Sequence, residues 1–456
     1  MSGVAAHELF SPGKIPTPDR CSIGTVCRKM RGMETLTTTE RRRLESLAAE
    51  GLAHYQVGRL NQLLDAILPE NKFYAEKLAG IKRPVKSLAE MLDWPFTYKE
   101  GLVSKLPNGE LANNLTFSLE HYSRFHQTSG TRGRPMVVLD TRDDWRWFHT
   151  CWDYILDAAE ILPSDRVLLA FSFGPFIGFW GGYDAFTSRG CLVVSGGGMS
   201  SLARLELARA SRATVICCTP SYALHLAQVG AEHQINVASL GVRTIIVAGE
   251  AGGSIPSVRQ RISEAWGAEI SDHAGATEVG PWGYGDLRGG GLYVLESEFI
   301  AEFRSVETGQ PATDGELSEI ILTSLGRIGS PVIRYRTGDL VRPTWHREGH
   351  NRFVFLPGGV LGRVDDMLII RGVNVFPSSI DQILRSFPEI VEYRITAFKQ
   401  AEMDQLRIEI EDRLSQPARV AEELKLRLSL TIEVEDVPLG SLPRFEGKGK
   451  RFVDQR

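Results

Sequence analysis

A glycine-rich segment at residues 128–135 (TSGTRGRP) carries residue types that suit phosphate binding. Successive backbone N–H groups of such a loop can converge on phosphate oxygens, hydroxyl groups add donors, and arginine adds a fixed cationic fork. The segment lacks the spacing and the Gly-Lys-Ser/Thr end of a Walker A motif. Its composition is therefore typical of a phosphate-binding loop and, equally, of a glycine-rich hairpin. The candidate residues are Thr128, Ser129, Gly130, Thr131, Gly133 and Arg134.

Two acidic residues stand where they could hold a metal ion and a sugar. Glu278 follows Thr277 and several small residues in SDHAGATEVG (271–280). A carboxylate there suits Mg²⁺ that carries nucleotide phosphates, although a single Glu in a loop is also typical of solvated surface. Asp339 lies in YRTGDL (335–340), where a carboxylate could accept two hydrogen bonds from a ribose diol or could simply end a strand.

A charged turn followed by a short apolar run marks residues 362–377 (GRVDDMLIIRGVNVFP). The apolar run at 367–370 has the length of one buried strand and is too short for a helix. Gly372 interrupts the run where a side chain would obstruct a tight turn or a close ligand. Pro377 then opens a helix, because proline in the first turn gives up a donor that is unpaired anyway. These features alone do not indicate an enzyme.

The segment at 362–377 closely resembles the hinge of phenylacetate–CoA ligases, which belong to the adenylate-forming (acyl-CoA synthetase) superfamily. The other motifs follow in the order of that family from about residue 60 to the C-terminus. The segment at 128–135 resembles the family's ATP-phosphate loop, but Arg132 and Arg134 depart from the usual Thr-Gly-Lys-Pro ending. Arginine keeps the charge of lysine and not its geometry, so the phosphate contacts would differ in detail.

The resemblance assigns roles around the nucleotide. It places Gly249 and Glu250 beside the adenine, Thr277 near the α-phosphate and Glu278 on the magnesium ion. Ala274 stands where the family usually has an aromatic residue, so no ring from that position would stack on adenine. His273 either takes that place or serves as a hydrogen-bonding or structural histidine. Asp339 inherits the ribose contact, and Arg363 opens the hinge beside the nucleotide.

The C-terminal segment at 440–451 (GSLPRFEGKGKR) is typical, by composition, of a frayed chain end. Family members end in an Arg-x-Glu-Gly-Lys segment whose lysine contacts both the carboxylate substrate and the α-phosphate. The resemblance gives this catalytic role to Lys448, with Lys450 as the alternative. It also places the hinge at Asp365 and Asp366 and the thiol channel at Gly372.

The acid pocket is predicted from an aromatic and glycine-rich run at 171–183, which offers walls for a flat acyl group. Apolar runs that line a core have the same composition, so an aryl substrate is one of two interpretations. The candidate residues are Phe171, Phe176, Gly181, Gly182 and Tyr183, together with His273.

The resemblance implies an acid–thiol ligase that uses ATP, magnesium and CoA. A carboxylate would attack the α-phosphorus of ATP to give an acyl-adenylate and pyrophosphate, and the CoA thiol would then displace AMP. Three alternatives remain: loading of an acid onto the phosphopantetheine of a carrier protein, a ligase that stops at an AMP-conjugate, and a catalytically silent nucleotide-binding homologue. The unusual residues Arg132, Arg134 and Ala274 motivate the last of these.

The elements that position these residues alternate between helical patterns and short apolar segments across residues 147–218. This alternation predicts a largely parallel sheet wrapped by helices, with ligands at the carboxyl ends of the strands. Glycine-rich breaks at 196–198 and 249–253 follow apolar segments, and the first of them could be a simple tight turn. With the resemblance, the sequence predicts an α/β fold with a flexible arm at 1–34, a large AMP-binding domain at 35–361 and a small mobile domain at 362–456. The hinge would lie at 362–366.

Composition limits the partners. The chain has 456 residues, with 52 basic and 56 acidic side chains and a net charge of −4, so no strong field favours nucleic acid or an anionic membrane. The six cysteines form no Cys-x-x-Cys pair, and no export signal is evident, which predicts a cytoplasmic protein. An uncharged run at 167–183 is nearly long enough to span a bilayer, but repeated glycines favour a strand, a turn and a helix start.

Overall fold

The structure is a computed structural model. It describes residues 36–104, 111–128, 135–345, 349–364, 368–370, 373–400, 403–428, 430–444 and 451–456. Several predicted residues lie outside these ranges: the arm at 1–34, Ser129, Gly130, Thr131, Arg132, Gly133, Arg134, Asp365, Asp366, Gly372, Lys448 and Lys450. The chain divides into two compact units, Met1–Leu36 and Thr37–Arg456, and the following paragraphs concern the second unit.

Helices begin this unit: α2 (Thr38–Glu45), α3 (Ala49–Ile67), α4 (Lys72–Lys77), the 3₁₀ turn η1 (Leu88–Met91) and α5 (Lys99–Leu102). Thr37 and Glu40 form a capping box that satisfies the first backbone donors of α2. The apolar stripe of α3 is buried in a small core with Tyr74 and Ile333. The sequence predicts two helical runs, at 44–57 and 60–68. The structure instead places the break at residues 46–48, where the backbone of Ala48 is extended.

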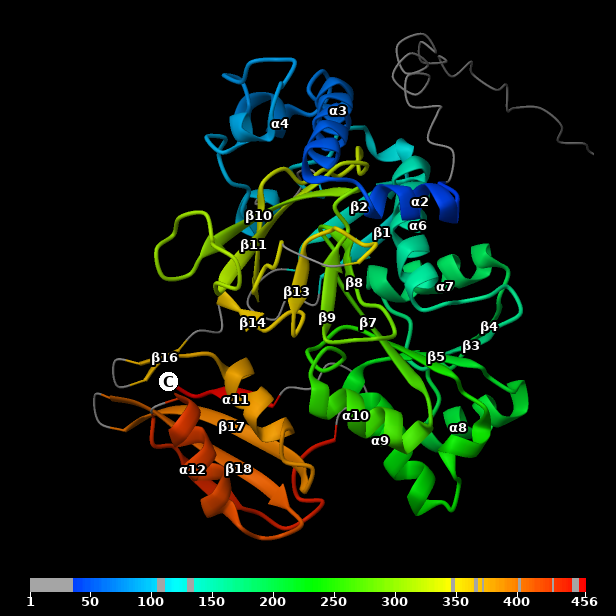
Figure 1. Ribbon diagram of the computed structural model, residues 1–456, viewed down its shortest axis with the longest axis vertical. Helices are drawn as coiled ribbons and strands as arrows, with labels where there is room; N and C mark the ends of the chain where they lie inside the picture. The colour runs from blue at the N-terminus through cyan, green and yellow to red at the C-terminus, as the bar shows by residue number, and fades with distance from the viewer. Residues whose placement is uncertain are drawn as a thin grey trace, which may run out of the picture. The chain divides into compact units, whose positions relative to one another are not determined.

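An eight-stranded mixed sheet forms the centre of the large domain, with strand order β13-β9-β8-β7-β6-β5-β3-β4 (Figure 1). Its strands are β3 (Arg166–Leu169), β4 (Leu192–Ser195), β5 (Val215–Cys218), β6 (Thr244–Val247), β7 (Glu269–Ala276), β8 (Gly280–Tyr284), β9 (Gly291–Val294) and β13 (Phe355–Pro357). Neighbours from β4 to β7 pair in parallel, and those from β7 to β13 pair antiparallel.

Helices cover both faces of the parallel strands because side chains alternate along each strand. Val167 and Leu169 belong to one core, whereas Leu168 and Ala170 belong to another. The first core includes α6 (Arg142–Ala158) and α7 (Ile177–Arg189), and the second includes α8 (Ser201–Ser211), α9 (Pro220–Glu232) and α10 (Pro256–Trp266). Figure 1 shows α9 and α10 side by side, in green. The 3₁₀ turns η2 (Leu119–His121) and η3 (Val237–Leu240) connect further elements.

Two smaller sheets are formed by segments that precede the C-terminal part. One is a hairpin of β1 (Tyr122–Gln127) and β2 (Val137–Thr141), and the other has the order β10-β11-β12-β14. The strands of the second are β10 (Phe299–Ser305), β11 (Ser318–Ser324), β12 (Tyr335–Val341) and β14 (Gly362–Arg363). The YRTGDL motif (335–340) thus lies wholly within β12 and does not follow a strand end.

The C-terminal part has its own hydrophobic core, which includes Ile380, Ile395, Ile408 and Leu424. Its elements are β15 (Leu368–Ile370), β16 (Val373–Val375), α11 (Pro377–Arg385), β17 (Ile390–Gln400), β18 (Met403–Asp412), α12 (Pro417–Leu428), β19 (Glu433–Asp436) and β20 (Phe452–Asp454). Pro377 opens α11, as the sequence predicts. The predicted α/β fold with a large and a small domain is confirmed.

The apolar run that could have crossed a bilayer forms β3, a connecting segment and α7. Across the part of the chain that the structure describes, no helix is both long and apolar enough to span a membrane.

Close packing of α6 against the second small sheet yields a stability prediction. Trp147 is buried, and its Nε1 donates to Glu298 Oε2 at 2.8 Å. A Cβ atom at Gly326 would overlap the indole of Trp147. We expect Gly326→Ala to lower the free energy of unfolding by about 1–3 kcal/mol, as overpacking does. Gly58→Ala is the control, because a Cβ there meets no atom within 4 Å. Urea unfolding would measure both, and an equal effect of the two substitutions would contradict this account.

Candidate active site

The base of the predicted phosphate loop is well defined. Strands β1 and β2 pair antiparallel on either side of it. The Thr128 N–H donates to the Met136 carbonyl, and the Met136 N–H donates to Thr128 Oγ1, each at 2.9 Å. Thr128 therefore closes the loop with both its backbone and its side chain. The remaining loop residues lie outside the described ranges.

A buried charged cluster connects this hairpin to the Thr-Glu motif. Arg327 Nε donates to Asp140 Oδ1 at 2.8 Å, and both side chains are fully buried. His126 Nδ1 lies 3.3 Å from Asp140 Oδ2. Burial alone would raise the pKa of Asp140, but Arg327 and His126 outweigh it and lower that pKa. Arg327 also donates through Nη1 to the carbonyl of Thr277 at 2.9 Å, so one guanidinium fixes Thr277 relative to the strands beside the loop.

Glu278 is held by the Tyr-Arg-Thr-Gly-Asp motif. The Tyr335 hydroxyl donates to Glu278 Oε1 at 2.7 Å. Burial and the charge of Glu278 together raise the pKa of Tyr335 well above its usual range. Four residues further along the same strand, Asp339 Oδ1 accepts a hydrogen bond from Arg363 Nη1 at 3.0 Å. Strand β12 therefore contacts Glu278 through Tyr335 and contacts Arg363 through Asp339.

The predicted adenine loop is held in part by a hydrogen bond to the neighbouring helix α9. Gly249 has a φ of +89°, which a glycine adopts without strain. Glu250 Oε1 accepts a hydrogen bond from the backbone N–H of Ser221 at 2.8 Å, in the first turn of α9. Ala274 lies on β7 opposite Gly283, and its methyl group provides no ring for stacking.

Sequence reasoning missed Asp272, which lies on β7 and packs against the glycine-rich segment at 249–253. Its Oδ2 accepts a hydrogen bond from Ser254 Oγ at 2.6 Å, and a Cβ at Gly253 would collide with its carboxyl group. Burial raises the pKa of Asp272 to about 7, although the Ser254 bond opposes this. An acidic residue in a strand that follows a glycine-rich loop was the available signal.

The predicted acid-pocket residues fall into two groups. Gly181 and Gly182 of α7 and His273 of β7 all lie against Trp152 of α6. The other group is aromatic: Phe171 and Phe176 both contact Phe179, with ring centroids 4.5 and 5.9 Å apart, and Tyr183 contacts Phe173 at 6.0 Å. Sequence reasoning missed Trp152, because its helix reads as a packing element.

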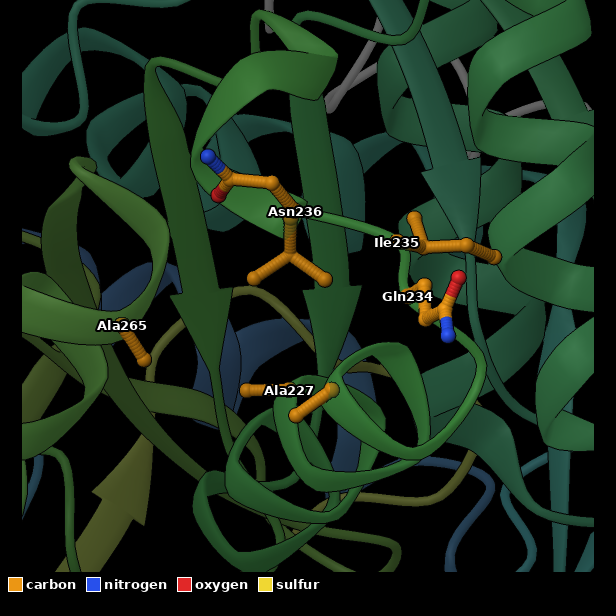
Figure 2. A pocket seen from close by; sticks show the side chains of 7 residues that line it. Ala227, Gln234, Ile235, Asn236 and Ala265 are labelled. Atoms are coloured by element: carbon orange, nitrogen blue, oxygen red, sulfur yellow. The ribbon is translucent and has the colours of Figure 1, made fainter.

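Two surface hollows lie away from this cluster. The first, of about 380 Å³, is lined by Ala227, Ala231, Gln234, Ile235, Asn236, Val237 and Ala265 (Figure 2). The second, of about 470 Å³, lies over α10. Neither contains a predicted site residue, so we assign neither to the chemistry.

Comparison with known proteins finds related families, sequences and structures. Residues 114–313 match the family model of AMP-binding enzymes, and residues 372–456 match that of the AMP-binding enzyme C-terminal domain. The chain is 29% identical over 446 residues to a phenylacetate–coenzyme A ligase of Thermus thermophilus, covering 91% of this chain and 98% of the relative. It is also 29% identical over 451 residues to the phenylacetate–coenzyme A ligase of Escherichia coli, covering 92% and 99%.

Solved structures of a 2-hydroxyisobutyryl-CoA ligase are also similar. The structure in the postadenylation state, in complex with R3-HIB-AMP, has a TM-score of 0.83 and 27% identity, covering 92% of this chain and 94% of that one. The structure of the same enzyme with 2-HIB-AMP and CoA has a TM-score of 0.69 over the same shares. The matches to the relatives and the solved structures span more than nine-tenths of the chain, and the part that matches the AMP-binding model includes Thr277 and Glu278. The chain therefore belongs to the adenylate-forming superfamily of AMP-binding enzymes, as a phenylacetate–CoA ligase-like member.

Proposed function

We propose that this protein activates a carboxylic acid with ATP to an acyl-adenylate and then transfers the acyl group to CoA. In the first step a carboxylate oxygen bonds to the α-phosphorus of ATP and pyrophosphate leaves. In the second the thiol of CoA bonds to the acyl carbon and AMP leaves. The observation that carries the proposal is that Arg327 joins Thr277 to Asp140 of the phosphate-loop hairpin, while Tyr335 of the Tyr335–Asp339 segment holds Glu278. The similarity to CoA ligases over more than nine-tenths of the chain supports it.

The chain's own residues bind and orient the reactants. Thr128 and residues 129–134 are proposed to hold the ATP phosphates, with Thr277 near the α-phosphate and Asp339 on the ribose. Gly249 and Glu250 would lie beside the adenine. The bond from Ser221 leaves the second carboxylate oxygen of Glu250 for other contacts. Lys448, or alternatively Lys450, would stabilise the charge that develops as the carboxylate attacks.

Glu278 fits a magnesium ion that travels with ATP. Mg²⁺ is commonly bound by one or two carboxylates together with substrate phosphates, and not by a complete protein cage. The described residues contain no group of three or more His, Cys, Asp or Glu side chains that could hold a metal ion, and Glu278 is the ligand that we propose. Tyr335 would orient that carboxylate through its hydrogen bond. When bound, the ion would neutralise phosphate charge.

The acid and the acceptor are narrower proposals. The similar ligases are named for phenylacetate and for 2-hydroxyisobutyrate, two acids that differ in size and polarity. The aromatic surroundings of Trp152 are compatible with an aryl acid. We propose CoA as the acceptor, since the similar structure holds CoA, and keep a carrier-protein phosphopantetheine as the alternative. Further proposals are the domain limits 35–361 and 362–456, the hinge at 362–366, the thiol channel at Gly372 and a cytoplasmic location.

The function can be tested directly. The purified chain is incubated with Mg²⁺, ATP and a panel of aryl and short hydroxy acids, and acid-dependent ATP–pyrophosphate exchange is measured. Addition of CoA should then give a thioester that mass spectrometry detects. Thioester on a carrier protein and none on CoA would favour the alternative acceptor. Failure of every acid to support exchange would contradict the proposal and favour a silent homologue.

The carboxylate–tyrosine pair predicts a magnesium phenotype. Tyr335→Phe keeps the ring and removes the donor that orients Glu278, so the Mg²⁺ concentration for half-maximal exchange should rise about tenfold. Glu278→Gln should raise it at least as much, with activity recovering at high Mg²⁺. Tyr154→Phe is the matched control, because its buried hydroxyl accepts a hydrogen bond from Ser297 Oγ and not from a residue of the site. An equal loss of exchange activity at every Mg²⁺ concentration would contradict the assignment of Glu278 as a magnesium ligand.

Asp272 predicts a pH dependence of stability. Its pKa is about 7 in the folded chain and about 4 when unfolded, so between these values the folded state binds the extra proton. Its contribution to stability is therefore present below pH 4 and is lost as pH rises to 7, at up to about 1.4 kcal/mol per pH unit. Asp272→Asn removes this loss.

We therefore expect the stability of Asp272→Asn relative to the wild type to increase between pH 5 and pH 7, as measured by urea unfolding. Asp65→Asn is the control, since the Asp65 side chain is 70% exposed, and its difference from the wild type should stay flat. A flat difference for Asp272→Asn as well would show that burial does not keep this carboxyl group protonated.

A further inference from the structure

Two ring nitrogens in the candidate acid pocket are buried without a hydrogen-bond partner among the described residues: Trp152 Nε1 and His273 Nδ1. Their rings are in contact, with centroids 4.8 Å apart and an interplanar angle of 64°. A buried polar atom without a partner is destabilising, and native structures keep few of them. A ligand that binds beside these two rings could therefore supply the missing hydrogen-bond partners.

The other buried polar atoms of this kind are less informative. Those of His126, Asp140 and Arg327 lie within ion-pair distance of one another. Arg407 and Arg419 belong to the C-terminal part. His149 Nε2 lies on α6, where the charges of Asp184, Asp153 and Arg124 also act on the ring. Trp152 and His273 differ from these because their immediate surroundings are aromatic and glycine residues.

The hydrogen-bonding capacity of the pair is defined. An indole Nε1–H can only donate. Burial lowers the pKa of His273 to about 4, although a hydrogen bond between its ring and the Ala274 backbone opposes this, so the imidazole is neutral at ordinary pH. A neutral imidazole nitrogen accepts or donates according to its tautomer. The pair therefore offers one fixed donor and one adaptable nitrogen, and no net charge.

The surroundings favour a flat or compact apolar group with one polar substituent. Phe148 and Trp152 both lie against Gly181 of α7. The rings of Phe186 and Trp152 have centroids 6.0 Å apart. A Cβ atom placed on Gly182 of α7 would lie 3.4 Å from the Trp152 ring. One turn earlier, Gly178 is exposed, and no described atom lies within 4 Å of its Cβ position. The glycine face of α7 thus runs from solvent to the indole.

We propose that the acid this enzyme activates carries a hydroxyl or oxo group on its acyl part, which hydrogen-bonds Trp152 Nε1 and His273 Nδ1. The inference rests on the proposed function and names the substrate class of the same site. A hydroxyl oxygen accepts from the indole N–H while its hydrogen reaches an imidazole nitrogen, and an oxo group accepts from both rings. An ammonium group cannot accept from the indole. A second carboxylate would be buried without a counter-charge, which is unfavourable.

The test compares matched acids in ATP–pyrophosphate exchange. Hydroxyphenylacetates are compared with phenylacetate, and 2-hydroxyisobutyrate with isobutyrate. We expect the better hydroxylated acid to exceed its unsubstituted partner about tenfold or more in kcat/KM, since a site built to bond a polar group rejects analogues that lack it. Trp152→Phe should bring this ratio close to one, chiefly by lowering kcat/KM for the hydroxylated acid. His273→Leu should lower the ratio as well.

Trp266→Phe is the matched control. Trp266 is equally buried, but its Nε1 already donates to the Ala223 carbonyl in the other core, so its loss should leave the ratio unchanged. Exchange with unsubstituted acids at equal or higher kcat/KM would overturn this inference and leave the proposed function intact. This comparison needs only the wild type, so it decides even if a variant fails to fold. Absence of exchange with every acid would overturn both.

Discussion

A single buried guanidinium holds the candidate active site together. Arg327 binds Asp140 on β2 and the carbonyl of Thr277 at the end of β7, in a place that water does not reach. A charge buried in this way is tolerated only when its partners are well placed, and removal of one partner would leave the other uncompensated. The hairpin that carries the phosphate loop belongs to one sheet, and the strands β7 and β8, whose connecting turn carries Glu278, belong to another. Their relative position therefore depends on the contacts of Arg327, and a substitution of Arg327 or Asp140 would leave a buried charge without its partner.

Neutral hydrogen-bond donors also orient the carboxylates of the candidate site. Tyr335 donates to Glu278, and the first turn of α9 donates to Glu250. Such donors fix a carboxylate without cancelling its charge, and they leave the remaining oxygen lone pairs available to a ligand. The site is thereby oriented before any ligand arrives, which lowers the entropic cost of binding.

The fold and the order of the motifs could be predicted from sequence because they depend on local patterns. The apolar strands β3, β5 and β6, the helix opened by Pro377 and the glycine-rich turns each have a local signature. Contacts between distant segments have none. Nothing near residue 327 indicates that its arginine reaches Thr277, and Trp152 reads as one of several aromatic residues on a helix. The break before α3 was misplaced because periodicity does not reveal an extended residue such as Ala48.

The pairing of Asp339 with Arg363 has a consequence for communication along the chain. Arg363 lies on the short strand β14, which pairs with β12 through Asp339 and Leu340. If a ribose diol takes hydrogen bonds from the same carboxylate, nucleotide and β14 share one acceptor. Linkage then requires reciprocity: a nucleotide that loosens Arg363 must bind more tightly once Arg363 has already been released. A two-residue strand would in this way report occupancy of the nucleotide site to the polypeptide that follows it.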